Sequence, residues 1–293
     1  MAQIIETFRQ VFPGKPTWSI DDLPDQSGRV VIKNAKVYLL ARSEDKALAA
    51  IEDLKQKTNK SDIHFIKLDL ADLTSIKQSV KEFTDKESQL HVLFNNAGVM
   101  FTPNGSKTPQ GWEMQLGTNV LGPILLTQLL LPTLIATAQE CSGEAKEKGS
   151  NIVRIVNTSS MGNIAYAPSK GGFEWSDPNL GFKDTQHSYG QSKFVNVAHA
   201  DHLSRKYGDQ GISAHSLNPG TIDSDLARHA SGLFNLLVKP TLYPVEFGRL
   251  NSLWAGLTVE AGRPEENGSY YVPWGRKGKP NSAIKDIDNV EKM

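Results

Sequence analysis

Short apolar runs and amphipathic stretches alternate along most of this chain. Runs typical of buried parallel strands occupy residues 36–40, 63–68, 90–94, 152–157, 212–217 and 269–272. Between them, apolar residues recur at helical spacing, as in Ala47, Leu48, Ile51 and Leu54, where Ser43 is a suitable N-cap. Strands that alternate with helices predict an α/β fold, a Rossmann-like doubly wound parallel sheet covered on both faces.

The first repeat of this pattern is truncated. A strand-like run at residues 28–33 is followed directly by another at residues 34–42, and no glycine occurs between Gly28 and Gly98. A βαβ unit takes about 30 residues, so roughly 20–25 residues are missing between Lys33 and Asn34. We therefore expect the first βα unit to be truncated, with the later strands in one sheet whose first edge is disturbed.

No repeat, low-complexity tract or linker divides the chain, so we expect a single domain over residues 1–293 with residues 1–27 as an N-terminal extension. Ile4, Ile5, Phe8, Val11 and Phe12 fall at helical spacing within that extension. They favour a short helix docked on the body of the protein, and the alternative is contact with a membrane surface.

Composition excludes several classes of partner. With 32 basic and 32 acidic residues, the chain has no net field to attract nucleic acid or an anionic membrane. A single cysteine, Cys141, excludes an internal disulfide and suits a reducing compartment, so we expect a cytoplasmic location. The longest apolar run, 120–136, is short and interrupted by polar residues and prolines, which predicts a core helix and no transmembrane segment. The seven histidines show no metal-ligand spacing, so no metal is expected.

Tyr189 and Lys193 are the strongest chemical signal. Four residues apart, they share one helix face and can converge on the same point. A free phenol titrates near pH ~10, and a nearby ammonium would lower that pKa and give a usable general acid or base. Strands at 90–94 and 152–157 deliver Asn95-Asn96-Ala97-Gly98 and Ser159-Ser160 at their carboxyl ends, where parallel sheets bind ligands.

Four motifs occur in one order: Asn95-Asn96-Ala97-Gly98, Ser159-Ser160, Tyr189-x-x-x-Lys193 and Asn218-Pro219-Gly220. With them the chain resembles the short-chain dehydrogenase/reductase family over about residues 28–275, closest to retinol-dehydrogenase-like and related fungal members. That resemblance implies hydride transfer between a nicotinamide and a lipophilic ketone, aldehyde or alcohol. It also implies a small lipophilic substrate and a homodimer face on the core helix.

The resemblance assigns catalytic roles to four residues. Tyr189 would exchange the proton, and Lys193 would favour the phenolate and bind the nicotinamide ribose. Ser160 would hydrogen-bond the reacting oxygen, with Ser159 as the alternative. Asn119 would hold a water linked to Lys193, or it would simply bridge core backbone.

The resemblance also implies a set of cofactor-binding residues: Arg42, Asp69, Leu70, Asn95, Gly98, Tyr189, Lys193, Pro219, Gly220, Ile222 and Ser224. The run Leu40-Ala41-Arg42-Ser43 carries no acidic residue for an adenine-ribose 2′-hydroxyl, whereas Arg42 can pair with a 2′-phosphate. NADP is therefore favoured over NAD.

The truncation leaves alternatives open. The family's glycine-rich turn, which receives the cofactor pyrophosphate at a helix N-terminus, is absent from the sequence. The chain is then either an active NADP-dependent oxidoreductase, or a silent or impaired member that acts as a binding or interaction protein. A truncated gene model of an active enzyme is the third explanation.

Two long excursions follow strand ends, at residues 161–186 and 223–257. Their apolar residues predict a lid over a lipophilic substrate, although ordinary helix packing explains the same residues.

Overall fold

The computed structural model describes residues 2–26, 29, 36–168, 171–224, 226 and 239–291. The expected first strand and the junction between Lys33 and Asn34 lie outside these residues, apart from Arg29. Each later strand occurs within one or two residues of its predicted range. The strands are β1 (Val37–Ala41), β2 (Ile63–Lys67), β3 (Val92–Asn95), β4 (Val153–Thr158), β5 (Ile212–Leu217), β6 (Tyr270–Val272) and β7 (Arg276–Lys277).

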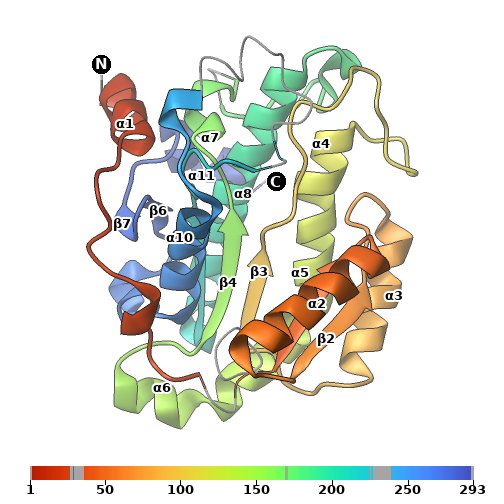
Figure 1. Cartoon of the computed structure of the whole chain (residues 1–293). Coiled ribbons are helices and arrows are strands. Elements are labelled where there is room, and N and C mark those ends of the chain that lie inside the picture. The colour runs from red at the N-terminus through yellow and green to blue at the C-terminus, as the bar shows by residue number, and fades with distance from the viewer. Residues whose placement is uncertain are drawn as a thin grey trace.

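Helices cover both faces of the strands, as a doubly wound fold requires (Figure 1). One face carries α3 (Leu73–Thr84), α5 (Gly122–Glu140) and α8 (Thr185–Tyr207), and the other carries α2 (Glu44–Thr58) and α10 (Val245–Leu257). The smaller helices are α1 (Ala2–Val11), α4 (Met114–Leu116), α6 (Ser142–Lys148), α7 (Gly162–Ala165) and α11 (Ile287–Val290). The α/β, Rossmann-like fold class is confirmed.

The described strands form two sheets where we expected one. β1 pairs with β2 in parallel, while β3, β4, β5 and β6 form a second parallel sheet with β7 antiparallel at its edge. In the usual doubly wound order, 3-2-1-4-5-6, the first strand lies between the second and the fourth. The break between β1 and β3 falls at that position. Among the described residues the sheet is therefore divided near its middle, whereas we expected a disturbance at its first edge. β1 is only half-buried along its whole length.

One apolar core nevertheless joins the two sheets. Ile66 of β2 lies in the same cluster as Leu93 of β3 and Ile155 of β4. Leu126 and Leu134 of α5 belong to this cluster and are nearly inaccessible to solvent. The helices on this face therefore hold together two sheets that share no backbone hydrogen bonds among the described residues.

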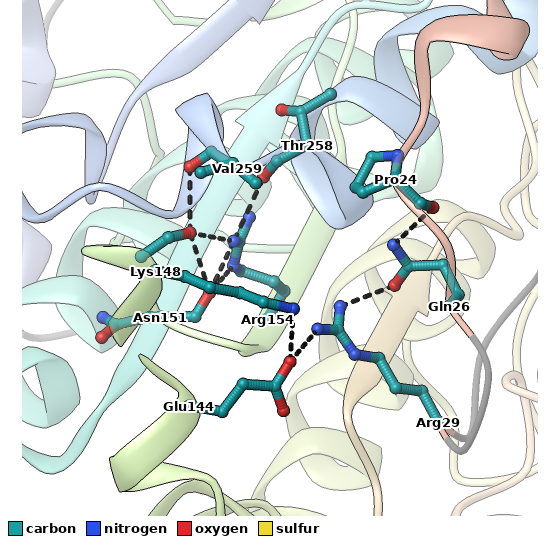
Figure 2. A network of polar contacts seen from close by, with 10 residues as sticks. Pro24, Gln26, Arg29, Glu144, Lys148, Asn151, Arg154, Thr258 and Val259 are labelled. Atoms are coloured by element: carbon teal, nitrogen blue, oxygen red, sulfur yellow. Dashed lines mark hydrogen bonds and ion pairs between the residues drawn. The ribbon is translucent and has the colours of Figure 1, made fainter. Parts of the chain in front are cut away.

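A polar network lies at the end of the sheet where the parallel strands begin, opposite their carboxyl ends (Figure 2). The guanidinium of Arg154, on β4, is 3% exposed and donates to the carbonyl oxygens of Asn151 (2.8 Å), Ala255 (3.3 Å) and Thr258 (3.2 Å). Ala255 and Thr258 lie at the end of α10, whose last carbonyls have no partner within the helix. Arg154 therefore attaches α10 to the sheet.

Arg29 marks the place where the missing unit would begin. Its side chain donates to Glu144 Oε1 at 2.6 Å and to Gln26 Oε1 at 2.7 Å (Figure 2). Its carbonyl oxygen accepts from the amide of Lys36 at 2.9 Å. Arg29 and Lys36 are therefore hydrogen-bonded to each other directly before β1.

The N-terminal helix α1 docks on the body, but not by its apolar face. Gln10 is 1% exposed, whereas Ile5, Phe8 and Phe12 are 50%, 64% and 51% exposed. The expected burial of the apolar stripe is therefore wrong, and a polar residue makes the contact.

The helical run Met114–Glu140 is long and apolar enough to cross a membrane by length and composition, which differs from our expectation for this region. Half of the apolar window is buried within the fold. Core helices of soluble proteins meet the same criterion, so the run is weak evidence for a membrane span.

Buried histidines predict a loss of stability in mild acid. His215, on β5, is fully buried, and burial together with the charge of Arg154 lowers its pKa from 6.5 to about 3. Between these values the unfolded chain binds a proton that the folded chain does not. Stability is therefore complete above pH ~6.5 and falls with pH below it, by about 1.4 kcal/mol per pH unit for this group.

We expect His215→Phe to reduce the slope of the unfolding free energy against pH between pH 6 and 4 by about that amount. Urea unfolding at a series of pH values measures it. Gln56→Met, at an exposed and non-titrating glutamine of α2, is the control and should leave the slope unchanged. An unaltered slope in His215→Phe would contradict the assignment.

Candidate active site

The carboxyl ends of β3, β4 and β5 place three segments at one edge of the larger sheet. These segments are 95–98, 158–160 and 218–220. Helix α8 begins at an N-cap, Asp184, and packs against β4 and β5. It brings Tyr189 and Lys193 to this edge, where their exposed fractions are 3% and 5%.

The two candidate serines have different partners. Ser160 lies close enough to Tyr189 for a side-chain hydrogen bond that lowers the pKa of the phenol. Ser160 Oγ accepts from the amide of Gly162 at 3.1 Å. Ser159 is buried and donates to the backbone oxygen of Lys193 at 2.7 Å. Ser160 therefore faces the phenol, and Ser159 ties β4 to α8.

Lys193 and Asn119 lie together beneath Gly98. Lys193 Nζ donates to the Thr158 carbonyl at 3.0 Å and lies 5.7 Å from the centre of the Tyr189 ring. A Cβ on Gly98 would lie 2.9 Å from Asn119 Oδ1 and 3.6 Å from Lys193 Nζ, so a glycine is needed for this approach.

Asn119 lies in a π-helical turn, Gly117–Leu121, a feature frequent at functional sites. Its Oδ1 accepts from the Val99 amide at 2.8 Å, and its Nδ2 donates to the Val99 carbonyl oxygen at 2.9 Å. The same Nδ2 also donates to Ser192 Oγ at 3.1 Å. These bonds match the alternative role, in which Asn119 bridges core backbone next to Lys193.

Burial dominates the acid–base properties of the pair. It raises the pKa of Tyr189 to about 12, although the hydrogen bond with Ser160 acts in the opposite direction. Burial also lowers the pKa of Lys193 to about 8. The expected lowering of the phenol pKa by Lys193 is therefore wrong for this arrangement, because two buried groups each lose hydration of their charged forms.

Two aromatic residues that the sequence analysis did not identify surround the phenol. The ring centre of Phe101 lies 5.6 Å from that of Tyr189 and 5.9 Å from that of Tyr166. Phe101 has φ 52°, an unusual value for a residue other than glycine. A Cβ on Gly190 would lie 2.1 Å from the Tyr166 carbonyl carbon, so Gly190 allows this segment to lie directly on α8.

The residues expected at the nicotinamide end lie close to this centre. Gly220 has φ 95°, and its amide donates to Asn218 Oδ1 at 3.1 Å, which holds the turn. Pro219 is half-buried, Ile222 pairs with Tyr243 in a parallel bridge, and Ser224 is exposed. A turn of this kind, beside Gly98 and Lys193, fits the nicotinamide half of a dinucleotide.

The residues expected at the adenosine end belong mostly to the smaller sheet. Arg42 is exposed directly after β1, and Asp69 and Leu70 follow β2. Asn95 lies on the larger sheet, where its Nδ2 donates to Thr127 Oγ1 and Asn157 Oδ1, both at 2.9 Å.

The pyrophosphate would lie between the nicotinamide and adenosine ends of the site. The described residues contain no glycine-rich turn followed by a helix between β1 and β3. The residues present therefore fit the nicotinamide half of the cofactor and do not fit its pyrophosphate.

Comparisons with known proteins agree with this geometry. The family model for short chain dehydrogenases matches residues 26–175. A short-chain dehydrogenase/reductase from Armillaria gallica is 43% identical over 312 positions, covering 100% of this chain and 96% of the relative. A second one from the same organism is 44% identical, with 94% of this chain and 91% of the relative covered. The first alignment is longer than this chain, so the relative contains residues that this chain lacks.

Solved structures show the same fold. An uncharacterized protein from Mycobacterium paratuberculosis has a TM-score of 0.65 at 25% identity and covers 94% of this chain, which covers 93% of that chain. The NADPH-bound carbonyl reductase from chicken fatty liver has a TM-score of 0.59 at 22% identity, with 85% of this chain and 90% of that chain covered. With these relatives over nearly its whole length, the chain belongs to the short-chain dehydrogenase/reductase family of oxidoreductases.

Proposed function

We propose that this chain derives from an NADP-dependent oxidoreductase that interconverts a lipophilic carbonyl compound and its alcohol. The observation that carries the proposal is the buried pair of Tyr189 and Lys193, with Nζ 5.7 Å from the ring centre, at the sheet edge where β4 leads into Ser160. NADPH, when bound, supplies the hydride to the carbonyl carbon.

The protein residues handle the proton. With its pKa raised to about 12, the Tyr189 phenol is protonated at neutral pH and ready to donate to a carbonyl oxygen that gains negative charge. Ser160 hydrogen-bonds the same oxygen. Lys193 stabilises the phenolate left after transfer.

Aromatic side chains support a lipophilic substrate. Phe101 and Tyr166 pack beside Tyr189, so a substrate that reaches the phenol must lie against apolar ring surface. The NADPH-bound carbonyl reductase among the structural relatives supports a carbonyl group as the reacting centre.

Arg42 supports NADP over NAD. It lies exposed at the end of β1, where a guanidinium can pair with a 2′-phosphate. The NADP complex of a gluconate 5-dehydrogenase from Burkholderia cenocepacia, which shares the fold with a TM-score of 0.57, is in keeping with this choice.

A second candidate function is a binding protein without turnover. The observation that favours it is the division of the sheet between β1 and β3. That division separates Arg42 from the catalytic residues and removes the pyrophosphate site between them.

We expect the 293-residue chain to bind NADPH very weakly. Without the glycine-rich turn, several charge-assisted hydrogen bonds of ~1.5–3 kcal/mol each are lost, which lowers affinity by orders of magnitude. Inserting the family's strand–turn–helix segment between Lys33 and Asn34 should restore binding. Isothermal calorimetry on both chains measures it, and micromolar affinity without the insert would refute our interpretation of the gap.

In the chain with the restored segment, Tyr189→Phe should abolish carbonyl reduction and leave NADPH affinity unchanged. The phenol supplies the proton but contributes little to cofactor binding. Steady-state oxidation of NADPH with a panel of lipophilic ketones and aldehydes provides the assay. Turnover that survives this substitution would exclude Tyr189 as the acid.

The same assay should distinguish the roles of Ser160 and Ser159. Ser160→Ala removes the partner of the reacting oxygen, so we expect kcat to fall by about 10²-fold or more with a small change in stability. Ser159→Ala breaks a bond to the Lys193 backbone, so it should lower stability by about 1 kcal/mol and reduce kcat less. Equal losses of kcat in the two variants would contradict the assignment of Ser160.

A further inference from the structure

Gln10 of the N-terminal helix is buried in polar contacts with the candidate active site. Its Oε1 accepts from Asn218 Nδ2 at 2.9 Å and from the Tyr270 hydroxyl at 3.2 Å. Its Nε2 donates to Glu6 Oε1 at 3.2 Å. Gln10 is 1% exposed, and its bonds with Asn218 and Tyr270 are buried, so the side chain has few alternative arrangements.

One branch of this contact reaches the nicotinamide-side turn. Asn218 Nδ2 donates to Gln10 of α1, while Asn218 Oδ1 accepts from the amide of Gly220. Its backbone oxygen accepts from Asn251 Nδ2 at 2.5 Å. Gln10 therefore fixes the rotamer of the side chain that holds the Gly220 turn.

The other branch reaches the catalytic serine. The Tyr270 oxygen, which donates to Gln10, accepts from Asn163 Nδ2 at 3.1 Å. The same Nδ2 donates to the Ser160 carbonyl oxygen at 2.6 Å. Asn163 is fully buried and Tyr270 is 3% exposed. Burial raises the pKa of Tyr270 far above its usual range, so the phenol remains a donor at all ordinary pH values.

We propose that Gln10 is a positioning residue of this active site, which fixes the Asn218–Gly220 turn relative to Ser160. The proposal rests on the proposed function, since these two segments contribute the nicotinamide contact and the hydrogen bond to the reacting oxygen. It makes the N-terminal extension part of the catalytic framework, although α1 lies far in sequence from every family motif. Gln10 itself touches neither substrate nor cofactor.

Two variants separate positioning from general stability. Gln10→Met keeps the side-chain length and removes all three hydrogen bonds. The double variant Glu6→Gln with Gln10→Glu exchanges donor and acceptor: residue 10 still accepts from Asn218 and Tyr270, and residue 6 donates to it. The exchange removes one bond, because Glu6 Oε1, which a donor nitrogen then replaces, also accepts from the Lys279 amide at 3.2 Å. Gln56→Met, at an exposed glutamine of α2, is the matched control.

The first measurement is amide hydrogen exchange on the 293-residue chain, which needs neither cofactor nor turnover. Gln10→Met should lose protection at the amides of Gly220, Gly162 and Asn163, which bond to Asn218 or Ser160. Protection in α3 and α5 should be unchanged, and the double variant should recover the lost protection. Loss spread evenly over the fold, or none at these amides, would overturn the proposal.

The second measurement uses the chain with the restored segment. Gln10→Met should lower kcat about 10- to 100-fold, as expected when reacting groups are misplaced by a fraction of an ångström to 1 Å. Affinity for 2′,5′-ADP, the adenine half of NADP, should be unchanged, and the double variant should regain most of the lost kcat. An unchanged kcat, or a parallel loss of 2′,5′-ADP affinity, would overturn the positioning role. If the restored parent chain itself shows no turnover, the proposed function fails, and hydrogen exchange alone decides whether Gln10 holds the two segments.

Discussion

The parallel pairing of β3, β4 and β5 is the constraint on which the candidate active site depends. Asn95 pairs with Asn157, and Thr158 with Leu217, so the three strands end at the same level. Parallel strands present the loops that follow them at one edge, and this brings Gly98, Ser160 and Gly220 together from distant parts of the sequence. A side-chain bond between Asn95 Nδ2 and Asn157 Oδ1 strengthens the first of these pairs. Helix α8 then needs only to pack on β4 and β5 to bring Tyr189 and Lys193 to that edge.

The break beside β3 explains why the site is complete at one end only. Backbone hydrogen bonds fix the position of each strand relative to its neighbour. Among the described residues, no such bonds join β3 to β1. The shared core of Ile66, Leu93 and Leu134 keeps the smaller sheet attached, but apolar contacts fix register less sharply than a hydrogen-bonded ladder. The position of Arg42 and Asp69 relative to the larger sheet therefore depends on this packing, while Ser160 and Gly220 are positioned by the ladder of the larger sheet itself.

The sequence predicts what local patterns encode. The apolar runs predicted β1 to β6 within one or two residues, because buried parallel strands are short and continuously apolar. The four-residue spacing predicted that Tyr189 and Lys193 lie on one side of α8. The chain order of the motifs placed Ser160 near them. In the structure Ser160 acts to lower the pKa of Tyr189, whereas Ser159 bonds to the backbone of Lys193.

Features set by the tertiary structure escaped the sequence analysis. The apolar stripe of α1 suggested that Phe8 and Phe12 face inward, yet Gln10 does, because its amide meets buried polar groups from Asn218 and Tyr270. The pKa of Tyr189 depends on how deeply the phenol is buried, which spacing alone does not reveal. The φ of Phe101 and the antiparallel strand β7 likewise follow from long-range packing.

The candidate catalytic residues also make structural contacts in this fold. Those contacts alone could explain why a truncated chain retains them. Lys193 Nζ caps the Thr158 carbonyl, its backbone oxygen accepts from Ser159, and Asn119 holds Val99. Each of these bonds is buried, so losing one partner would leave an unsatisfied group at a cost of about 1–3 kcal/mol. Retention of the set is therefore expected whether or not the chain turns over substrate. The orientation of Ser160 is more informative, because its hydroxyl acts on the pKa of the Tyr189 phenol, whereas Ser159 makes the buried bond that joins β4 to α8. A hydroxyl directed at the phenol, at the sheet edge that also carries Gly98 and Gly220, is the part of the arrangement that stability alone does not require.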